Sequence, residues 1–290
     1  MFIDKNGDKW YKVGLHIHTT VSDGKKTPEE MARIYKNAGF DAVAMTDHWV
    51  YHGEDEIDGL KIISGCEYNL GSTNTIGDTM HIVGFGMQKD PKLVRETATR
   101  QGVIDKINEC GGFAVFAHPY WSLNDKKDAE ELNGFSFVEI YNSVSDVYMS
   151  NRADSSYLIE SLANDGYIIP IIATDDVHYY NGQDNCISYV MVKAESGEVK
   201  DILKALSEGN YYSSQGPHLE VWRDGDKIIA ECSPCKKIAF MSNAAWARDR
   251  MVRGDWVESA EYTIKDLEKW LRVEVTDKDG NRAWSNIIKL

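Results

Sequence analysis

The chain has 290 residues, of which 42% are hydrophobic and 27% are charged, a composition typical of a folded globular protein. Lys and Arg number 32 against 46 Asp and Glu, and the formal charge of −14 argues against binding to long nucleic acids or anionic lipid surfaces. The start of the chain has no apolar signal segment, the sequence has no run of about 18 apolar residues, and its five cysteines are scattered. We therefore expect a reduced, cytoplasmic protein without membrane contact.

Short apolar runs alternate with amphipathic stretches from residue 13 to about residue 208. Several runs are apolar at nearly every position, which predicts parallel strands that helices cover on both faces. Helices are predicted over 28–39, where Thr27, Pro28 and Glu30 form a capping-box pattern, and over 91–109 and 198–208. The alternation predicts an α/β fold, and a barrel in preference to an open sheet. The eight predicted strands span 13–18, 41–46, 61–66, 80–85, 113–117, 136–141, 168–173 and 187–192.

The pattern changes near Tyr211, after which short alternating runs are separated by turns, and strands are predicted over 219–222, 227–232, 238–242, 262–264 and 270–276. We expect a β-rich, sandwich-like appendage here, and divide the chain into an α/β domain over 1–208 and a C-terminal β-rich domain over 209–290. Five tryptophans in this second domain are expected to build its core. The pair Cys232 and Cys235 lacks the second pair that a closed zinc site needs, so we interpret it as structural.

Residues with metal-binding chemistry lie at or beside the ends of the predicted strands. His16 and His18 are two apart on a strand, so both side chains should face the same side. The C-terminal ends of barrel strands converge at one mouth, and six of the eight histidines lie at or beside strand ends. Imidazole and carboxylate ligands suit Zn²⁺, Mn²⁺ or Fe²⁺, and the candidates are too many for one tetrahedral ion. We predict a cluster of two or three divalent ions whose ligands are His16, His18, Asp23, His48, Glu67, His81, His118, Asp176 and His178.

Three divalent ions would make this cluster net positive in an acidic protein, which favours an anionic substrate such as a phosphate ester. The sequence has no Walker A motif, no GxGxxG motif after a strand and no GxSxG elbow, so no catalytic side chain is assigned. Metal-activated water is the expected nucleophile. Arg152 is the first candidate for a phosphate fork, and Asn142, Lys25, Lys26 and His52 are further candidates for substrate contact. Solvated surface charge is the alternative interpretation of the charged residues.

The order of these motifs resembles the PHP (polymerase and histidinol phosphatase) family over about residues 10–208. The resemblance implies a distorted (β/α)7 barrel with a trinuclear metal site, in which Asp47 and Asp175 support the ligands. It further implies a first metal on His16, His18, Glu67 and Asp176, a second on Glu67, His81 and His118, and a third on Asp23, His48 and His178. The motifs that carry it are His16-Ile17-His18-Thr19, Ser22-Asp23-Gly24, Thr46-Asp47-His48, Glu67, His81, His118-Pro119 and Asp176-Val177-His178.

The C-terminal part, in residues 211–217, 271–277 and 283–286, is similar to that of CehA-like predicted metallohydrolases, a PHP subgroup. The family resemblance implies hydrolysis of a small phosphate ester, either a phosphomonoester or a nucleotide. Three alternatives stay open. They are hydrolysis of a carbamate or carboxylic ester at the same metal centre, a non-enzymatic metal-binding role, and a nuclease. The chain lacks the basic stripe that a nuclease for long polyanions needs.

Overall fold

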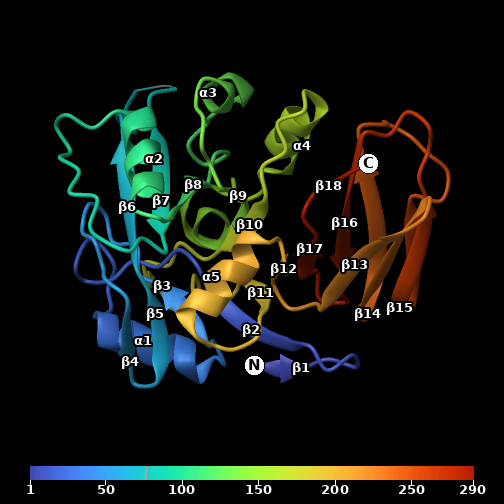
Figure 1. Cartoon of the computed structure of the whole chain (residues 1–290), viewed down its shortest axis with the longest axis horizontal. Helices are drawn as coiled ribbons and strands as arrows, with labels where there is room; N and C mark the ends of the chain where they lie inside the picture. Colours follow the sequence, from blue (N-terminus) through green and yellow to red (C-terminus); the bar gives the residue numbers. More distant parts are fainter. Residues whose placement is uncertain (76) are drawn as a thin grey trace.

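A β/α part and a β-rich part lie side by side in the chain (Figure 1). The structure is a computed structural model that describes residues 1–75 and 77–290. Its helices are α1 (Pro28–Asn37), α2 (Arg100–Glu109), α3 (Lys126–Glu130), α4 (Ser156–Asn164), α5 (Val199–Ser207) and the π-helix η1 (Ser145–Ser150). Its strands are β1 (Phe2–Ile3), β2 (Lys9–Gly14), β3 (Ala42–Ala44), β4 (Asp55–Ile57), β5 (Leu60–Ile63), β6 (Gly65–Leu70), β7 (Met80–Phe85), β8 (Phe113–Ala117), β9 (Phe137–Asn142), β10 (Ile171–Thr174), β11 (Tyr189–Lys193), β12 (Tyr211–Ser214), β13 (Leu219–Asp224), β14 (Lys227–Ser242), β15 (Met251–Thr263), β16 (Trp270–Thr276), β17 (Arg282–Trp284) and β18 (Ile288–Lys289).

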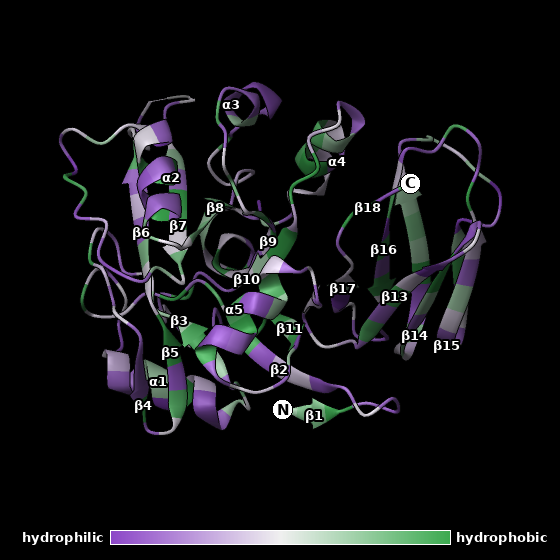
Figure 2. Cartoon of the chain, viewed as in Figure 1, coloured by the Kyte–Doolittle hydropathy of each residue, from purple (hydrophilic) through white to green (hydrophobic). Residues whose placement is uncertain are grey.

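The strands of the β/α part belong to two sheets. In the first sheet β2, β3 and β5 pair in parallel and β11 pairs antiparallel to β2, whereas the second has the order β10-β9-β8-β7-β6. Isolated bridges link the sheets where Ile17 meets Val177 and where His48 meets Glu67. Hydrophobic residues are concentrated in strands such as β9 and β10, whereas α5 shows both hydrophilic and hydrophobic residues (Figure 2). None of the described helices is long and apolar enough to cross a membrane.

The expectation of fully parallel strands is wrong for β6, β7 and β8, which pair antiparallel to one another. The connection from β6 to β7 is short, and a parallel pair needs a crossover of about a dozen residues or more. Because β7 runs against β8, the start of β7 lies beside the end of β8, and His81 pairs in register with Ala117. A histidine that opens its strand is thereby brought next to His118.

Several predicted boundaries differ from the structure. Helix α2 begins only after Thr99, whose side chain accepts a hydrogen bond from the Gly102 amide, so residues 91–99 lie outside the helix. The strand predicted over 61–66 is split between β5 and β6, which places Glu67 inside a strand rather than at its end. The strand predicted over 13–18 ends at Gly14, so His16 and His18 lie beyond it. Helix α1, with the predicted capping box at Thr27, is confirmed.

The C-terminal strands continue the first sheet of the β/α part. Strand β12 pairs with β11 on one side and with β17 on the other, and the sheet extends through β16 and β14 to β13. The sheet is therefore continuous across the predicted domain boundary. Trp270 and Trp284 are buried, but the core assignment is wrong for Trp222, Trp246 and Trp256, which are 40%, 78% and 71% exposed. Trp222 and Trp256 lie on β13 and β15, each of which pairs only with β14 among the described residues.

Candidate metal centre

The nine predicted metal ligands lie together in three overlapping groups. Within each group every residue offers one ligand atom that is within 4.8 Å of the others. The loops and strands that bring them together come from both sheets of the β/α part. The groups are His16, His18, Glu67 and Asp176; Glu67, His81 and His118; and His18, Asp23, His48 and His178.

The first group has the spacing of a tetrahedral site. His16 Nε2 lies 3.2 Å from His18 Nε2 and 3.2 Å from Asp176 Oδ1, and 3.3 Å from Glu67 Oε2. Zinc–nitrogen and zinc–carboxylate bonds of about 2.0–2.1 Å place tetrahedral ligands about 3.3 Å apart. The spacing around His16 Nε2 therefore suits one small divalent ion.

Glu67 divides its two carboxylate oxygens between the first and second groups. Oε2 faces His16 and lies 3.0 Å from His18 Nε2, whereas Oε1 lies 2.9 Å from His81 Nδ1 and 3.2 Å from His118 Nε2. The side chain is 1% exposed. A carboxylate in this position can connect two metal ions.

The third group is the most exposed of the three. Asp23 Oδ2 lies 3.4 Å from His178 Nε2 and 3.7 Å from His48 Nε2, and the Asp23 side chain is 50% exposed. His18 joins this group through Nδ1, 3.5 Å from Asp23 Oδ1, which the sequence did not predict. The groups thus run from buried His16 to the half-exposed Asp23.

The chemistry of the buried donor atoms fits cations. Asp176 Oδ1 and His48 Nδ1 are buried and make no hydrogen bond, although Asp176 Oδ1 lies 3.1 Å from His18 Nε2. The Nε2 atoms of His16 and His18 face each other, and the other nitrogen of His16 is held by a carboxylate. Buried polar atoms without partners are costly, and a metal ion between them would remove that cost.

The backbone of some ligands has a strained conformation that sets the direction of the side chain. His118 and Asp176 have φ angles of 27° and 52°, in the left-handed region that side chains with a Cβ seldom adopt. A Cβ on Gly24 would lie 2.6 Å from the His18 carbonyl oxygen, so only glycine allows the loop carrying Asp23 to pass this close.

Glu139 supports the first two groups and was missed in the sequence. Its Oε1 lies 2.7 Å from His16 Nδ1, and its Oε2 accepts hydrogen bonds from the His118 amide at 2.7 Å and from Asn142 Nδ2 at 2.9 Å. A carboxylate on the far nitrogen of a metal-binding histidine fixes its tautomer and orientation. The available signal was the one charged residue in strand β9, between the apolar residues Val138 and Ile140.

Asp47 and Asp175 both brace the surrounding structure. Asp47 accepts hydrogen bonds from Thr19 and Ser22, which shapes the loop that leads to Asp23. Asp175 accepts from the Tyr35 hydroxyl at 2.7 Å and from the Ser188 amide at 2.7 Å. Neither belongs to the three ligand groups.

Burial and neighbouring charges oppose each other in the pKa values of these ligands. Burial lowers the pKa of His18, but Asp176 and Glu67 outweigh it and raise that pKa to about 10. Burial lowers the pKa of His48 to about 4. Burial raises the pKa of Glu67, but the surrounding histidines hold it well below its usual range. Protons and cations therefore compete for the same atoms.

The residues predicted to contact substrate differ in their surroundings. Asn142 is fully buried and donates to Asp176 Oδ2 at 3.2 Å. His52 Nε2 lies 2.7 Å from Asp47 Oδ2, and Lys26 pairs with Glu30 at 3.4 Å.

Lys25 Nζ donates to the Asp23 carbonyl oxygen at 3.4 Å, beside the third group. The backbone amide of half-buried Arg152 donates to the Ser145 carbonyl oxygen at 3.3 Å. Direct contact of these residues with substrate stays a prediction.

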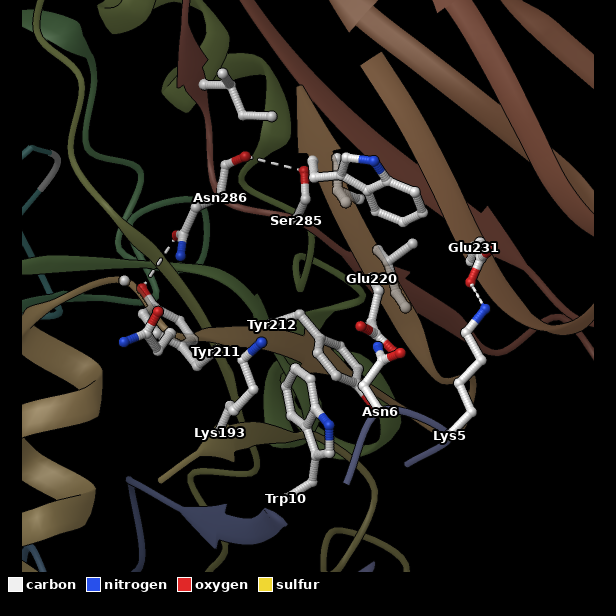
Figure 3. Close-up of a pocket in the computed structure, with 16 residues that line it drawn as sticks. Lys5, Asn6, Trp10, Lys193, Tyr211, Tyr212, Glu220, Glu231, Ser285 and Asn286 are labelled. Carbon is white, nitrogen blue, oxygen red and sulfur yellow. Dashed lines mark hydrogen bonds and ion pairs between the residues drawn. The ribbon is translucent and has the colours of Figure 1, made fainter. Parts of the chain in front are cut away.

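A separate cavity of about 550 Å³ lies where the two parts of the chain meet (Figure 3). Trp10 and Tyr212 line it together with Glu220 and two lysines. The lysines are already paired, Lys5 with Glu231 and Lys193 with Asp8. The nine ligands predicted for the metal centre do not line this cavity.

The buried histidine–carboxylate groups on this α/β fold are suited to holding metal ions. A family model described as the PHP domain matches residues 14–214. The chain therefore belongs to the PHP domain family, and it is a metal-dependent hydrolase of that family.

The chain is also similar to individual proteins and to a solved structure. The chain is 30% identical over 176 residues to an uncharacterized protein of Methanocaldococcus jannaschii, covering 54% of this chain and 97% of that protein. It is 32% identical over 102 residues to a 5′-3′ exoribonuclease of Haemophilus influenzae, covering 33% of this chain and only 36% of that enzyme. A crystal structure from Bacteroides vulgatus, of a two-domain protein containing a predicted PHP-like metal-dependent phosphoesterase, matches with a TM-score of 0.53 and 14% identity. That match covers 100% of this chain and 97% of the other, and it shows a shared fold.

Proposed function

We propose that the protein hydrolyses a small phosphate ester, a phosphomonoester or a nucleotide, at a site holding two or three divalent metal ions. The single observation that carries the proposal is Glu67, whose two oxygens face two separate groups of histidines. A site for one structural ion needs only four ligands. It needs no shared carboxylate and no ligand that borders solvent. The proposal includes a barrel-like arrangement of the two sheets around this centre and a CehA-like relationship of the C-terminal part.

Some of the ligand side chains are buried, and others border solvent. The first group is buried and holds its atoms at tetrahedral spacing, whereas Asp23 and His48 border solvent. A phosphoryl group would enter on the side of Asp23, where Lys25 adds a positive charge. Divalent ions in these groups would lower the pKa of bound water and neutralise phosphoryl oxygens.

The supporting residues keep the ligands in place during this chemistry. Glu139 holds the proton on His16 Nδ1, so that Nε2 remains free to bind. Asn142 and Glu139 are joined by a hydrogen bond, and Asn142 also donates to Asp176. This network limits rotation of the Asp176 carboxylate.

Metal analysis combined with a substrate panel tests the proposal. The purified protein is analysed for manganese, zinc and iron, then assayed with Mn²⁺ on p-nitrophenyl phosphate, a naphthyl ester and a naphthyl carbamate. We expect bound metal and turnover of the phosphate. Turnover of the ester or carbamate alone would contradict the phosphoesterase proposal and favour the CehA-like alternative. A lack of turnover on all three, with a melting temperature that falls in EDTA, would favour a binding role.

Substitution of a ligand tests the assigned residues. Asp176→Asn keeps the shape of the side chain but removes its charge, and we expect turnover to fall more than about 100-fold, with loss of bound metal. His218→Ala is the matched control, because His218 contacts Tyr212 and Glu220 outside the three groups. Equal rates in the wild type and Asp176→Asn would refute the site.

A further inference from the structure

The cavity of about 550 Å³ in Figure 3 has walls from both parts of the chain. Strands β2 and β11 of the β/α part contribute residues to its lining, and so do strands β13 and β14 of the β-rich part. Small-molecule sites have volumes of about 300–1,000 Å³ and often lie where two domains meet. The size and the position of this cavity are therefore those of a ligand site.

The charged side chains that line the cavity compensate one another. Two lysines and two glutamates line it, so the lining has no net charge. Lys5 is paired with Glu231. Lys193 is paired with Asp8 at 3.1 Å. A charged ligand would have to break one of these pairs to find a counter-ion, so the lining favours an uncharged ligand over the anions that suit the metal centre.

Two side-chain amides in the lining have hydrogen-bonding capacity left. Asn6 makes no side-chain hydrogen bond within residues 1–75 and 77–290. Asn210 donates from Nδ2 to Glu208 at 3.1 Å, and its Oδ1 accepts no hydrogen bond within the same residues. An amide offers a donor and an acceptor side by side. Two neighbouring hydroxyl groups on a ring, each of which both donates and accepts, match this arrangement.

Trp222 adds an exposed aromatic ring to the same lining. Its side chain is 40% exposed, whereas Trp10 and Tyr212 are each 4% exposed and pack edge to face with ring centres 5.3 Å apart. Figure 3 shows the rings of Trp10 and Tyr212 close together, with Lys193 beside them. The C–H face of a sugar packs against an aromatic ring while its hydroxyl groups bond to polar side chains. An exposed indole in one cavity with free amides thus matches a sugar better than a purely apolar compound.

We propose that this cavity is a binding site for an uncharged sugar, distinct from the metal centre. The site does not depend on the proposed hydrolysis, because none of the nine metal ligands lines the cavity. A bound sugar contacts both parts of the chain, and a ligand that binds only the folded protein raises its stability. The sugar therefore stabilises the chain where its two parts meet.

Calorimetric titration of the whole chain with glucose, galactose, N-acetylglucosamine and maltose tests the site. We expect at least one of these sugars to bind and to raise the melting temperature. Trp222→Ala should weaken that binding about tenfold, because the exposed ring is lost. The matched control is Trp256→Ala, at a 71% exposed tryptophan on β15 that does not line the cavity, and it should change the affinity by less than about twofold.

A variant of the metal centre separates the two sites. Asp176→Asn should bind the same sugar as tightly as wild type does, and in this variant glucose 6-phosphate should bind less tightly than glucose. Four results would overturn the proposal. They are no binding of any of the four sugars, equal affinity in Trp222→Ala and wild type, loss of sugar binding in Asp176→Asn, and tighter binding of glucose 6-phosphate than of glucose in that variant.

Discussion

Glu139 orients two ligands at once, although it is not itself among the nine. One oxygen faces His16 Nδ1 and also accepts from the Thr174 hydroxyl at 2.7 Å, whereas the other accepts from the amide of His118. The carboxylate is buried, and burial raises its pKa, but the adjacent His16 outweighs burial and keeps that pKa below its usual range. Glu139 therefore keeps its negative charge beside the His16 imidazole.

Glu139→Gln tests this role. The amide group keeps the size of the side chain, but its nitrogen cannot accept from the His118 amide, so one ligand loses its support. We expect manganese affinity and turnover to fall about 10- to 100-fold. Titration with Mn²⁺ and steady-state kinetics measure both, with the exposed Glu131→Gln as control. Wild-type affinity in Glu139→Gln would show that His16 and His118 hold their orientation without the carboxylate.

The nine candidate ligands stand out chemically in the local sequence, as do Asp47 and Asp175, whereas the supporting residue Glu139 does not. His16, His48 and His178 follow apolar runs, a position that the sequence displays directly. Glu67 and His81 were also chosen, but their placement depends on the antiparallel pairing of β6 and β7, which no local pattern revealed. The supporting bonds of Glu139 join residues that are distant in the chain, so only the folded structure reveals them.

The elements of the C-terminal part were predicted less well, because their strands are longer and more bent than the apolar runs. Strand β14 replaces the two strands expected over 227–232 and 238–242, and its pairing with β15 shifts register around Cys235. The alternating pattern is interrupted at those shifts. The strand over 270–276, which has no such irregularity, is confirmed as β16.

A buried acid joins β14 and β15 at their ends. Glu268 accepts hydrogen bonds from the Tyr262 hydroxyl at 2.8 Å and from Ser242 at 2.6 Å, and pairs with Arg250 at 3.0 Å. Burial raises its pKa, but these donors outweigh burial and lower the pKa below 4.5. A lowered folded-state pKa stabilises the fold above the unfolded value, and this contribution is lost as the pH falls through the folded pKa.

Glu268→Gln should therefore reduce the free energy of unfolding by about 2 kcal/mol at pH 7, because it removes charge-assisted hydrogen bonds. The difference from wild type should narrow as the pH falls below about 4.5, where the wild-type carboxylate begins to take up a proton in the unfolded chain. Urea unfolding at several pH values measures this difference in the free energy of unfolding. Glu258→Gln, at an exposed position, is the control. A difference that is constant with pH would contradict the charge argument.

The two parts of the chain share packing as well as a sheet. Trp284 of β17 is fully buried and stacks on Tyr141 of β9 with ring centres 5.7 Å apart. Arg272 of β16 pairs with Glu160 of α4 at 2.6 Å. Tyr141 in turn donates a hydrogen bond to Asp146 on η1, so this contact of the C-terminal part extends to the segment that follows Asn142.

Trp284→Ala should accordingly destabilise both parts together. Removing a buried tryptophan costs about 3–5 kcal/mol, and we expect one unfolding transition at a lower urea concentration by both fluorescence and circular dichroism. The exposed Trp246→Ala should leave the midpoint nearly unchanged. Two separate transitions in Trp284→Ala would mean that the β/α part is stable without this contact.

The shared carboxylate of Glu67 has a consequence for how the protein takes up its ions. An ion held by one group would fix the Glu67 carboxylate, whose other oxygen would then face the second group in a binding orientation, so we expect each ion to raise the affinity for the other. Under limiting metal, native mass spectrometry should find mostly empty and multiply loaded molecules, with few that carry a single ion. Cells short of the metal would thus hold a small fully active population of the protein in place of a uniformly weakened one.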